Sequence, residues 1–251
     1  MARAKSAVAK QVYPITHTPA PHGERISHVA ENYLLSLYNL EEESVKPTPA
    51  QLADYIRHLP ATEGLGSSLP TVTGMLRRMV REHLIVMSPR KEIELTPRGR
   101  VLAEDMVRRH RLAERMVVDM LGLELHLAHI EAHRLEHAIS SELEQKIVEK
   151  LGNPTTCPFG RPIPKSGYIP PASEAMTLDK ATTGLRYLVD RVPEEDHDLL
   201  RFLIEHAVLP NQEITVHEAG QYRGVLVFKT SVGQNALGYE AAARVWVRRL
   251  G

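Results

Sequence analysis

The sequence predicts a mainly α-helical protein that begins with a winged helix-turn-helix and ends in a small β module. Apolar residues recur at helical spacing as far as residue 151, and one short alternating stretch interrupts them after residue 83. Beyond residue 175 the pattern changes to short strands. The 251 residues are sufficient for one to three domains, each with its own core.

Three helices and a hairpin are predicted in the first part of the chain. Ser27 and Thr48 can cap helices, and Pro49 and Pro70 suit first helical turns. The predicted helices cover residues 27–43, 48–59 and 70–83, and the hairpin covers 84–87 and 92–95 around a tip at 88–91. This order is that of a winged helix-turn-helix. The last of the three helices, at 70–83, would enter the DNA major groove, and the wing would contact phosphates.

Further helices follow the hairpin. Thr96 and Pro97 start a long helix that runs to about Leu121 and is closed by Gly122. A second helix covers residues 127–139, and Ser140 restarts a third that runs to Leu151.

The rest of the chain divides into a proline-rich segment and a β-rich tail. Residues 152–173 contain six prolines and three glycines, which is the composition of a linker. Strands are predicted at 183–192, 213–217, 224–229 and 244–249, with a helix at 194–206. The expected division is a flexible extension at 1–25, a winged helix-turn-helix at 26–96, a helical domain at 97–152, a linker at 153–174 and a β domain at 175–251.

The net charge of zero is the sum of a basic segment and an acidic segment. Lys and Arg together number 31, as do Asp and Glu, but residues 70–111 carry a net charge of +5 and residues 112–206 carry −6. The balance argues against a polybasic nucleic-acid binder, but not against a local basic surface. No apolar run approaches the about 20 residues of a membrane span. The single cysteine, Cys157, fits a protein of the reducing cytoplasm that has no membrane partner.

The basic segment carries side chains suited to DNA. Short hydroxyl side chains near the start of the predicted helix at 70–83 can reach phosphates or base edges. Basic residues follow on the same helix and at the wing tip. The candidate DNA-binding residues are Ser68, Thr71, Thr73, Arg77, Arg78, Arg90 and Lys91. The alternative is an ordinary solvated face of an amphipathic helix.

Histidine and glutamate recur on the helices that follow. His110 and Glu114 share one helix face, and His129, His133, Glu136 and His137 form a stripe on the next helix. Imidazoles and carboxylates that converge between two helices are typical ligands of a divalent metal. The alternative is that they are surface residues. The sequence contains no HExxH, CxxC or glycine-rich phosphate loop.

The sequence resembles the diphtheria-toxin-repressor family of iron- and manganese-dependent transcriptional regulators. The segments that carry the resemblance are AENYLLSLYNLEEE, LTPRGRVLAEDMVRRHRLAERMVVDMLGL, HIEAHRLEHAISSELEQKI and CPFGRPIP. The resemblance implies a helical dimerisation domain, an SH3-like β-barrel at the C-terminus, and metal-dependent binding of a homodimer to a palindromic operator in double-stranded DNA. It implies no small-molecule substrate.

The resemblance also implies two metal sites. One site maps to His110, Glu114 and His129. The activating site maps to Asn32, His133, Glu136 and His137, and Asp190 and Glu194 are candidate donors from the SH3-like domain. Iron-responsive members usually have Met and Cys where this chain has Asn32 and His133, and manganese-responsive members usually have Asp and Glu. The expected cofactor is Mn(II) or Fe(II), and the absence of sulfur ligands favours manganese.

The sequence is compatible with three functional hypotheses. The first is a metal-activated repressor. The second is a winged-helix regulator in which the histidine cluster is structural and another signal is sensed. The third is a metalloenzyme, which would need an open metal position and a nucleophile or general base that the motifs do not provide. The expectation is therefore a protein that is not an enzyme.

Overall fold

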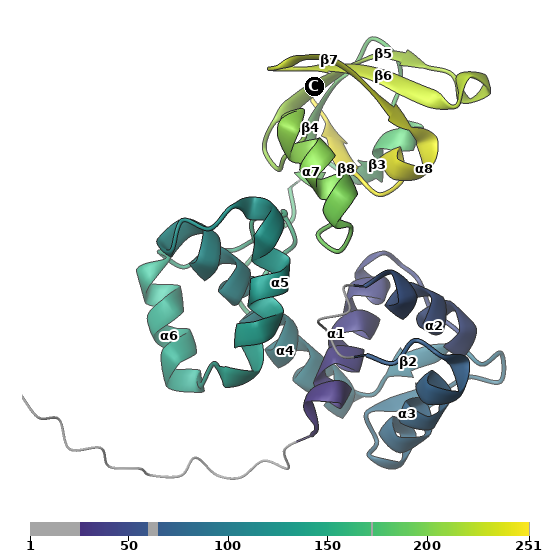
Figure 1. Ribbon diagram of the computed structural model, residues 1–251, viewed down its shortest axis with the longest axis vertical. Coiled ribbons are helices and arrows are strands. Elements are labelled where there is room, and N and C mark those ends of the chain that lie inside the picture. The colour runs from purple at the N-terminus through teal and green to yellow at the C-terminus, as the bar shows by residue number, and fades with distance from the viewer. Residues whose placement is uncertain (1–25, 60–64, 172, 251) are drawn as a thin grey trace, which may run out of the picture.

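The computed structural model describes residues 26–59, 65–171 and 173–250 (Figure 1). The predicted extension at 1–25 and part of the turn within the helix-turn-helix lie outside these residues. A winged helix-turn-helix, a group of helices and a C-terminal β domain follow one another along the chain (Figure 1). In the described part of the chain, no helix is both long enough and apolar enough to cross a membrane.

The winged helix-turn-helix is confirmed. Helices α1 (His28–Glu42), α2 (Pro49–His58) and α3 (Leu69–Arg81) precede the two-stranded wing, β1 (Ile85–Met87) and β2 (Ile93–Leu95). The side chains of Ser27 and Thr48 each accept a backbone N–H at the start of a helix, as the capping pattern predicts, and the side chain of Ser68, which was not predicted as a cap, does the same for α3. One apolar cluster joins the three helices to the wing.

The helical domain also follows the prediction, with two local differences. Helix α4 (Pro97–Arg115) packs against α1 and α5 (Leu125–Leu135), and it ends in a π-helical turn, η2 (Met116–Met120), before Gly122 at φ 70°. Helix α5 tightens into a 3-10 turn, η3 (Glu136–Ala138), and α6 (Ser141–Lys150) follows. In Figure 1, α4 extends from the winged helix-turn-helix to the other helices.

The C-terminal domain is a six-stranded antiparallel sheet in the order β3-β8-β4-β5-β6-β7. Its elements are β3 (Ala175–Thr177), η4 (Leu178–Lys180), β4 (Arg186–Arg191), α7 (His197–Glu205), β5 (Glu213–Ala219), η5 (Gln221–Arg223), β6 (Val225–Thr230), β7 (Gly233–Gly238), α8 (Tyr239–Ala242) and β8 (Trp246–Arg249). Four strands and α7 match the predicted positions. The sequence did not reveal β3, which has three residues, or β7, whose GQNALG sequence lacks β-branched residues.

The proline-rich segment differs from the tether that its composition suggests. Cys157, Phe159 and Ile163 are fully or almost fully buried. Cys157 and Phe159 belong to the core of the β domain, which also includes Val117 and Ala128 from the helical domain. The segment is therefore packed between the helical domain and the β domain, and one apolar core includes residues of both domains and of the segment.

Arginines of α4 hold this segment in place. Arg108 donates to the carbonyl of Pro164 at 2.7 Å, and Arg115 donates to that of Thr156 at 2.7 Å. Between them, Arg111 donates to the carbonyl of Pro162. The segment thus runs antiparallel to α4, and its backbone carbonyls are satisfied by a row of guanidinium groups.

A glycine sets the distance between the wing and α4. A Cβ added at Gly99 would lie 1.8 Å from the backbone oxygen of Leu84, whereas nothing lies within 4 Å of a Cβ added at Gly74 in α3. We expect Gly99→Ala to lower the free energy of unfolding by about 1–3 kcal/mol, because the wing must move away from α4. Gly74→Ala should raise it by up to about 1 kcal/mol. Thermal unfolding followed by circular dichroism checks both; an unchanged Tm for Gly99→Ala would contradict the packing.

Candidate metal centre and DNA-binding surface

The predicted metal ligands lie between α4 and α5. His110 and Glu114 of α4 face His129 and His133 of α5, and Glu136 follows in η3. All five side chains are buried. Ala113, Ala128 and Ala132 are also fully buried, and these small residues allow the two helices to approach closely. The helical spacing in the sequence thus produces one buried polar cluster inside an apolar interface.

Glu136 contacts three imidazoles. Its Oε2 lies 2.5 Å from Nδ1 of His110, and its Oε1 lies 3.0 Å from Nδ1 of His133. The same Oε1 lies 3.4 Å from Nε2 of His137. A single carboxylate therefore connects residues from α4, α5 and η3.

Glu114 forms the second centre of the cluster. Its Oε1 lies 3.0 Å from Nε2 of His110 and 3.2 Å from Nδ1 of His129. Its other oxygen, Oε2, is buried and has no hydrogen-bond partner among the described residues. A buried carboxylate oxygen without a donor is a position that suits a cation.

The charges in the cluster depend on one another. Burial opposes the protonation of His110, but the carboxylates of Glu114 and Glu136 outweigh it and raise the pKa of His110 to about 9. Although burial raises the pKa of a carboxyl group, the imidazole of His110 lowers the pKa of both Glu114 and Glu136. A metal ion that binds His110 must displace this proton, so metal binding and proton release are coupled.

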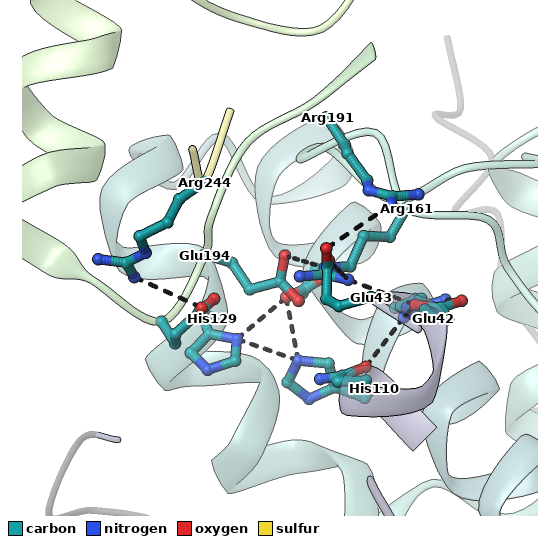
Figure 2. Close-up of polar contacts among 12 residues, drawn as sticks. Glu42, Glu43, His110, His129, Arg161, Arg191, Glu194 and Arg244 are labelled. Atoms are coloured by element: carbon teal, nitrogen blue, oxygen red, sulfur yellow. Dashed lines mark hydrogen bonds and ion pairs between the residues drawn. The ribbon is translucent and has the colours of Figure 1, made fainter. Parts of the chain in front are cut away.

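The C-terminal domain supplies Glu194 to the same region. Ligand atoms of Glu114, His129 and Glu194 lie within 4.8 Å of one another, as do those of His110, His129 and His133. The carboxylate of Glu194 lies near His129 and accepts a hydrogen bond from Nε of Arg161 at 2.9 Å (Figure 2). Burial raises the pKa of Glu194, and Arg161 offsets only part of this effect.

Asp190, the other predicted donor of the C-terminal domain, has a different partner. It accepts a hydrogen bond from Nε of Arg248 at 2.6 Å, within the β domain. The structure therefore brings Glu194, and not Asp190, to the histidine cluster.

Helix α1 carries the predicted ligand Asn32, and it approaches the centre through His28 and Glu31, which local sequence patterns did not reveal. Asn32 lies buried on α1, and its backbone oxygen accepts the hydroxyl of Ser36 at 3.0 Å. On the same helix, Glu31 lies 2.8 Å from Nδ1 of His137, and the ring of His28 stacks on that of His137. The spacing of His28, Glu31 and Asn32 on one helix face was visible in the sequence. The closeness of α1 to η3 was not, because 106 residues separate Glu31 from His137.

The donor chemistry fits a divalent transition metal. The cluster offers imidazole nitrogens and carboxylate oxygens. One of these oxygens, Oε2 of Glu114, accepts no hydrogen bond from the described residues. Among the described residues, the thiol of Cys157 belongs to none of the clusters in which three candidate ligand atoms lie close together. The residues present therefore match an ion that takes nitrogen and oxygen ligands.

The candidate DNA-binding residues gather on α3 and the wing. Ser68 caps α3 and its Oγ lies 2.7 Å from Oγ1 of Thr71, whereas Thr73 is half-buried. Arg77 and Arg78 are exposed along α3, and Nε of Arg78 pairs with Glu82 at 2.7 Å.

The wing tip carries the remaining two candidates. Arg90 and Lys91 are both exposed, and Lys91 has φ 62°, which closes the turn between β1 and β2. Two cationic side chains therefore project from the end of the hairpin, as a phosphate-contacting wing requires.

Comparison with known proteins identifies the family. Residues 96–165 match the family model described as iron dependent repressor, metal binding and dimerisation domain, and residues 176–249 match the FeoA domain. The iron-dependent repressor IdeR of Mycobacterium leprae is 36% identical over 233 residues, which cover 88% of this chain and 96% of the relative. The chain belongs to the diphtheria-toxin-repressor family.

Other members of the diphtheria-toxin-repressor family agree with this assignment. The diphtheria toxin repressor of Corynebacterium efficiens is 45% identical over 134 residues, which cover 53% of this chain and 54% of the relative. A solved manganese-dependent transcriptional repressor in complex with manganese has a TM-score of 0.77 and 30% identity, and the match covers 88% of this chain and all of that one. The family model of the metal-binding domain spans every candidate ligand on α4, α5 and η3.

Proposed function

We propose that this chain is a metal-activated transcriptional repressor, which binds a palindromic operator as a homodimer when Mn(II) or Fe(II) is bound. The buried cluster of histidines and glutamates on α4, α5 and η3, with the orphaned oxygen of Glu114, carries the proposal. The named relatives are iron- and manganese-dependent repressors, which supports it.

The cluster is placed to control the orientation of the DNA-binding domain. Helix α1 belongs to the core of the winged helix-turn-helix, and it packs directly against α4. Glu136 and Glu114 orient the imidazoles, and Glu31 connects α1 to His137. His110, His129 and Glu114 would hold the ion, which would supply positive charge between α4 and α5. Metal and operator then favour the same arrangement of the domains, so each increases the affinity for the other.

Exposed apolar side chains support a dimer through the helical domain. Val101 of α4, Met120 and Leu121 at the end of the π-helical turn, and Leu143 of α6 are exposed by 45–69%. A partner that covers such side chains removes apolar surface from water, which stabilises the complex. A second copy of the chain, as in the matched dimerisation domain, would cover them.

The donor set favours Mn(II) over Fe(II), because the cluster offers carboxylate oxygens and imidazoles but no sulfur ligand. We further infer a regulatory rather than a catalytic role in the cytoplasm. The candidate ligands are already bonded to one another, and the related proteins are transcriptional repressors.

The decisive experiment is an operator titration. The operator is selected from random-sequence DNA with the full chain and Mn²⁺, and binding is followed by fluorescence anisotropy with Mn²⁺, anaerobic Fe²⁺, Zn²⁺ or a chelator. We expect tight binding with Mn²⁺ or Fe²⁺ and weak binding with the chelator. Equal operator affinity with and without the chelator would overturn the proposal and favour a winged-helix regulator with a structural histidine cluster.

The wing tip should contribute through phosphates. We expect Arg90→Ala to weaken binding to operator and to random DNA by a similar factor, and to reduce the salt dependence of log K by about one unit. Lys146→Ala, an exposed residue on α6, is the matched control and should change neither quantity. A selective loss of operator binding in Arg90→Ala would show instead that this side chain reads a base.

A further inference from the structure

We infer that Gly74 sets how closely α3 approaches the bases of the operator, and that it is therefore a specificity-determining residue. Gly74 is exposed and lies in the middle of α3, which spans Leu69–Arg81. It is not among the DNA-binding residues predicted from the sequence. The inference rests on the proposed function, because it takes α3 as the helix that enters the major groove.

The fold gives no reason for a glycine at this position. A glycine in the middle of a helix is less stable there than an alanine. A Cβ added at Gly74 would have nothing within 4 Å beyond its own stretch of helix, whereas a Cβ at Gly99 would meet the backbone of Leu84 at 1.8 Å. Gly74 also has an ordinary helical backbone, without the positive φ of Gly122. In the described part of the chain, neither packing nor backbone conformation requires the missing side chain.

Gly74 lies on the side of α3 that faces away from the protein core. The buried residues Val72, Leu76 and Met79 define the inner face of this helix. Because successive residues of an α-helix are rotated by about 100°, Gly74 is rotated by about 200° from Val72 and lies almost opposite to it. The outer face of such a helix is the one that a recognition helix presents to the groove.

Exposed polar side chains flank Gly74 on the same face. Thr71 lies one turn before it, Arg77 and Arg78 lie one turn after it, and Arg81 lies two turns after it. Long cationic side chains can reach phosphates at the edges of the groove, and a short hydroxyl side chain can reach a base edge only when the backbone is close. The face therefore combines long side chains with one stretch of bare backbone.

The major groove leaves little room for a side chain at this point. An α-helix with its side chains is about 10–12 Å across, and the groove is about 12 Å wide. The outermost residue of the helix lies closest to the base edges. A glycine there lets the backbone approach them and brings Thr71 within reach, whereas a larger residue at position 74 would hold α3 away. Contacts from flexible arginines to phosphates tolerate the larger distance, so the effect falls on operator binding rather than on DNA binding in general.

Substitutions of increasing size test this inference. The operator is selected with the wild-type chain and Mn²⁺, and the affinities of the full-length variants for operator and for random DNA are measured by fluorescence anisotropy with Mn²⁺. We expect Gly74→Ala to lower operator affinity about tenfold, as one mismatched base pair does. Gly74→Leu should lower it further. The affinity for random DNA should change by less than about twofold, since phosphate contacts supply it.

Thermal unfolding of the same variants separates this role from a structural one. Alanine and leucine favour a helix more than glycine does, so the Tm of Gly74→Ala and Gly74→Leu should equal or exceed that of the wild type. A more stable protein that binds its operator more weakly is a result that a purely structural role would not give. Gln145→Ala, at an exposed position in the middle of α6, is the matched control and should change neither DNA affinity.

The inference and the proposed function fail through different results. Wild-type operator affinity in both Gly74→Ala and Gly74→Leu would overturn the inference, even when operator binding depends on metal. An equal loss on operator and on random DNA would also overturn it, because Gly74 would then have no part in choosing the sequence. Operator binding by the wild type that ignores metal would overturn the proposed metal activation alone, and a wild-type chain that selects no operator would overturn both.

Discussion

Replacing Glu136 by glutamine is expected to lower the operator affinity measured with Mn²⁺ by about 100-fold, which is within the usual range of allosteric coupling. The carboxylate of Glu136 faces the imidazoles of His110, His133 and His137 at 2.5–3.4 Å. Glutamine keeps the size of the side chain but removes the negative charge and one acceptor oxygen. Metal binding therefore weakens, and the domains are no longer held in the arrangement that binds DNA.

The measurement is operator anisotropy at a fixed free Mn²⁺ concentration, repeated with a chelator. The matched control is Glu142→Gln, which alters an exposed carboxylate in the first turn of α6. Glu136→Gln and wild type should bind operator with the same low affinity in the chelator, because the DNA-contacting residues are unchanged. A Glu136→Gln protein that Mn²⁺ still activates to the wild-type affinity would show that this carboxylate is dispensable.

Replacing Arg161 by methionine is expected to lower the free energy of unfolding by about 3–5 kcal/mol, the usual cost of breaking a buried ion pair. The Arg161 side chain is 7% exposed, and it donates to Glu194 at 2.9 Å and to Glu43 at 3.0 Å (Figure 2). Without it, the carboxylate of Glu194, whose side chain is 2% exposed, loses its cation. The bridge that Arg161 forms between Glu43, at the end of α1, and Glu194 is lost at the same time.

Thermal and urea unfolding of the full chain measure the effect. Arg57→Met removes an exposed arginine whose partner is Asp54, and it should change stability by less than about 1 kcal/mol. The double variant Arg161→Met with Glu194→Gln should recover part of the loss, because no charged carboxylate then remains unpaired at position 194. An unchanged Tm for Arg161→Met would mean that water replaces the guanidinium at no cost.

Local signals in the sequence predicted most of the fold. Capping residues such as Ser27, Thr48 and Thr96 mark helix starts directly, because each satisfies backbone N–H groups of its own helix. The short β3 and the weakly patterned β7 were missed, since pairing with neighbouring strands, rather than composition, makes them strands.

Composition misled the interpretation of the proline-rich segment for a related reason. Prolines and glycines indicate irregular backbone, but not whether that backbone is packed. The relevant signal was on α4, where Arg108, Arg111 and Arg115 recur at helical spacing and donate to carbonyls of the segment. Without the fold, these arginines cannot be distinguished from a solvated helix face.

The candidate metal site shows the same division. Helical spacing placed His110 with Glu114, and His129 with His133, and the structure brings these residues together. The approach of Glu31 and His28 to His137 depends on how α1 packs against the helical domain. Glu194, and not Asp190, reaches the histidine cluster, whereas Asp190 pairs with Arg248 of β8. The spacing of residues along one helix does not predict contacts between elements that are distant in the sequence.

The burial of Cys157 gives the molecule its own probe of domain opening. The thiol is fully buried in the core shared by the helical and C-terminal domains, and burial raises the pKa of the Cys157 thiol. An alkylating reagent can reach it only when the proline-rich segment leaves this core, and the chain has no other cysteine to react. The ratio of labelling rates in the native and denatured protein therefore measures the free energy of that opening. An ion that engages Glu194 would oppose the opening, so metal should slow the labelling in proportion to the energy with which it holds the two domains together.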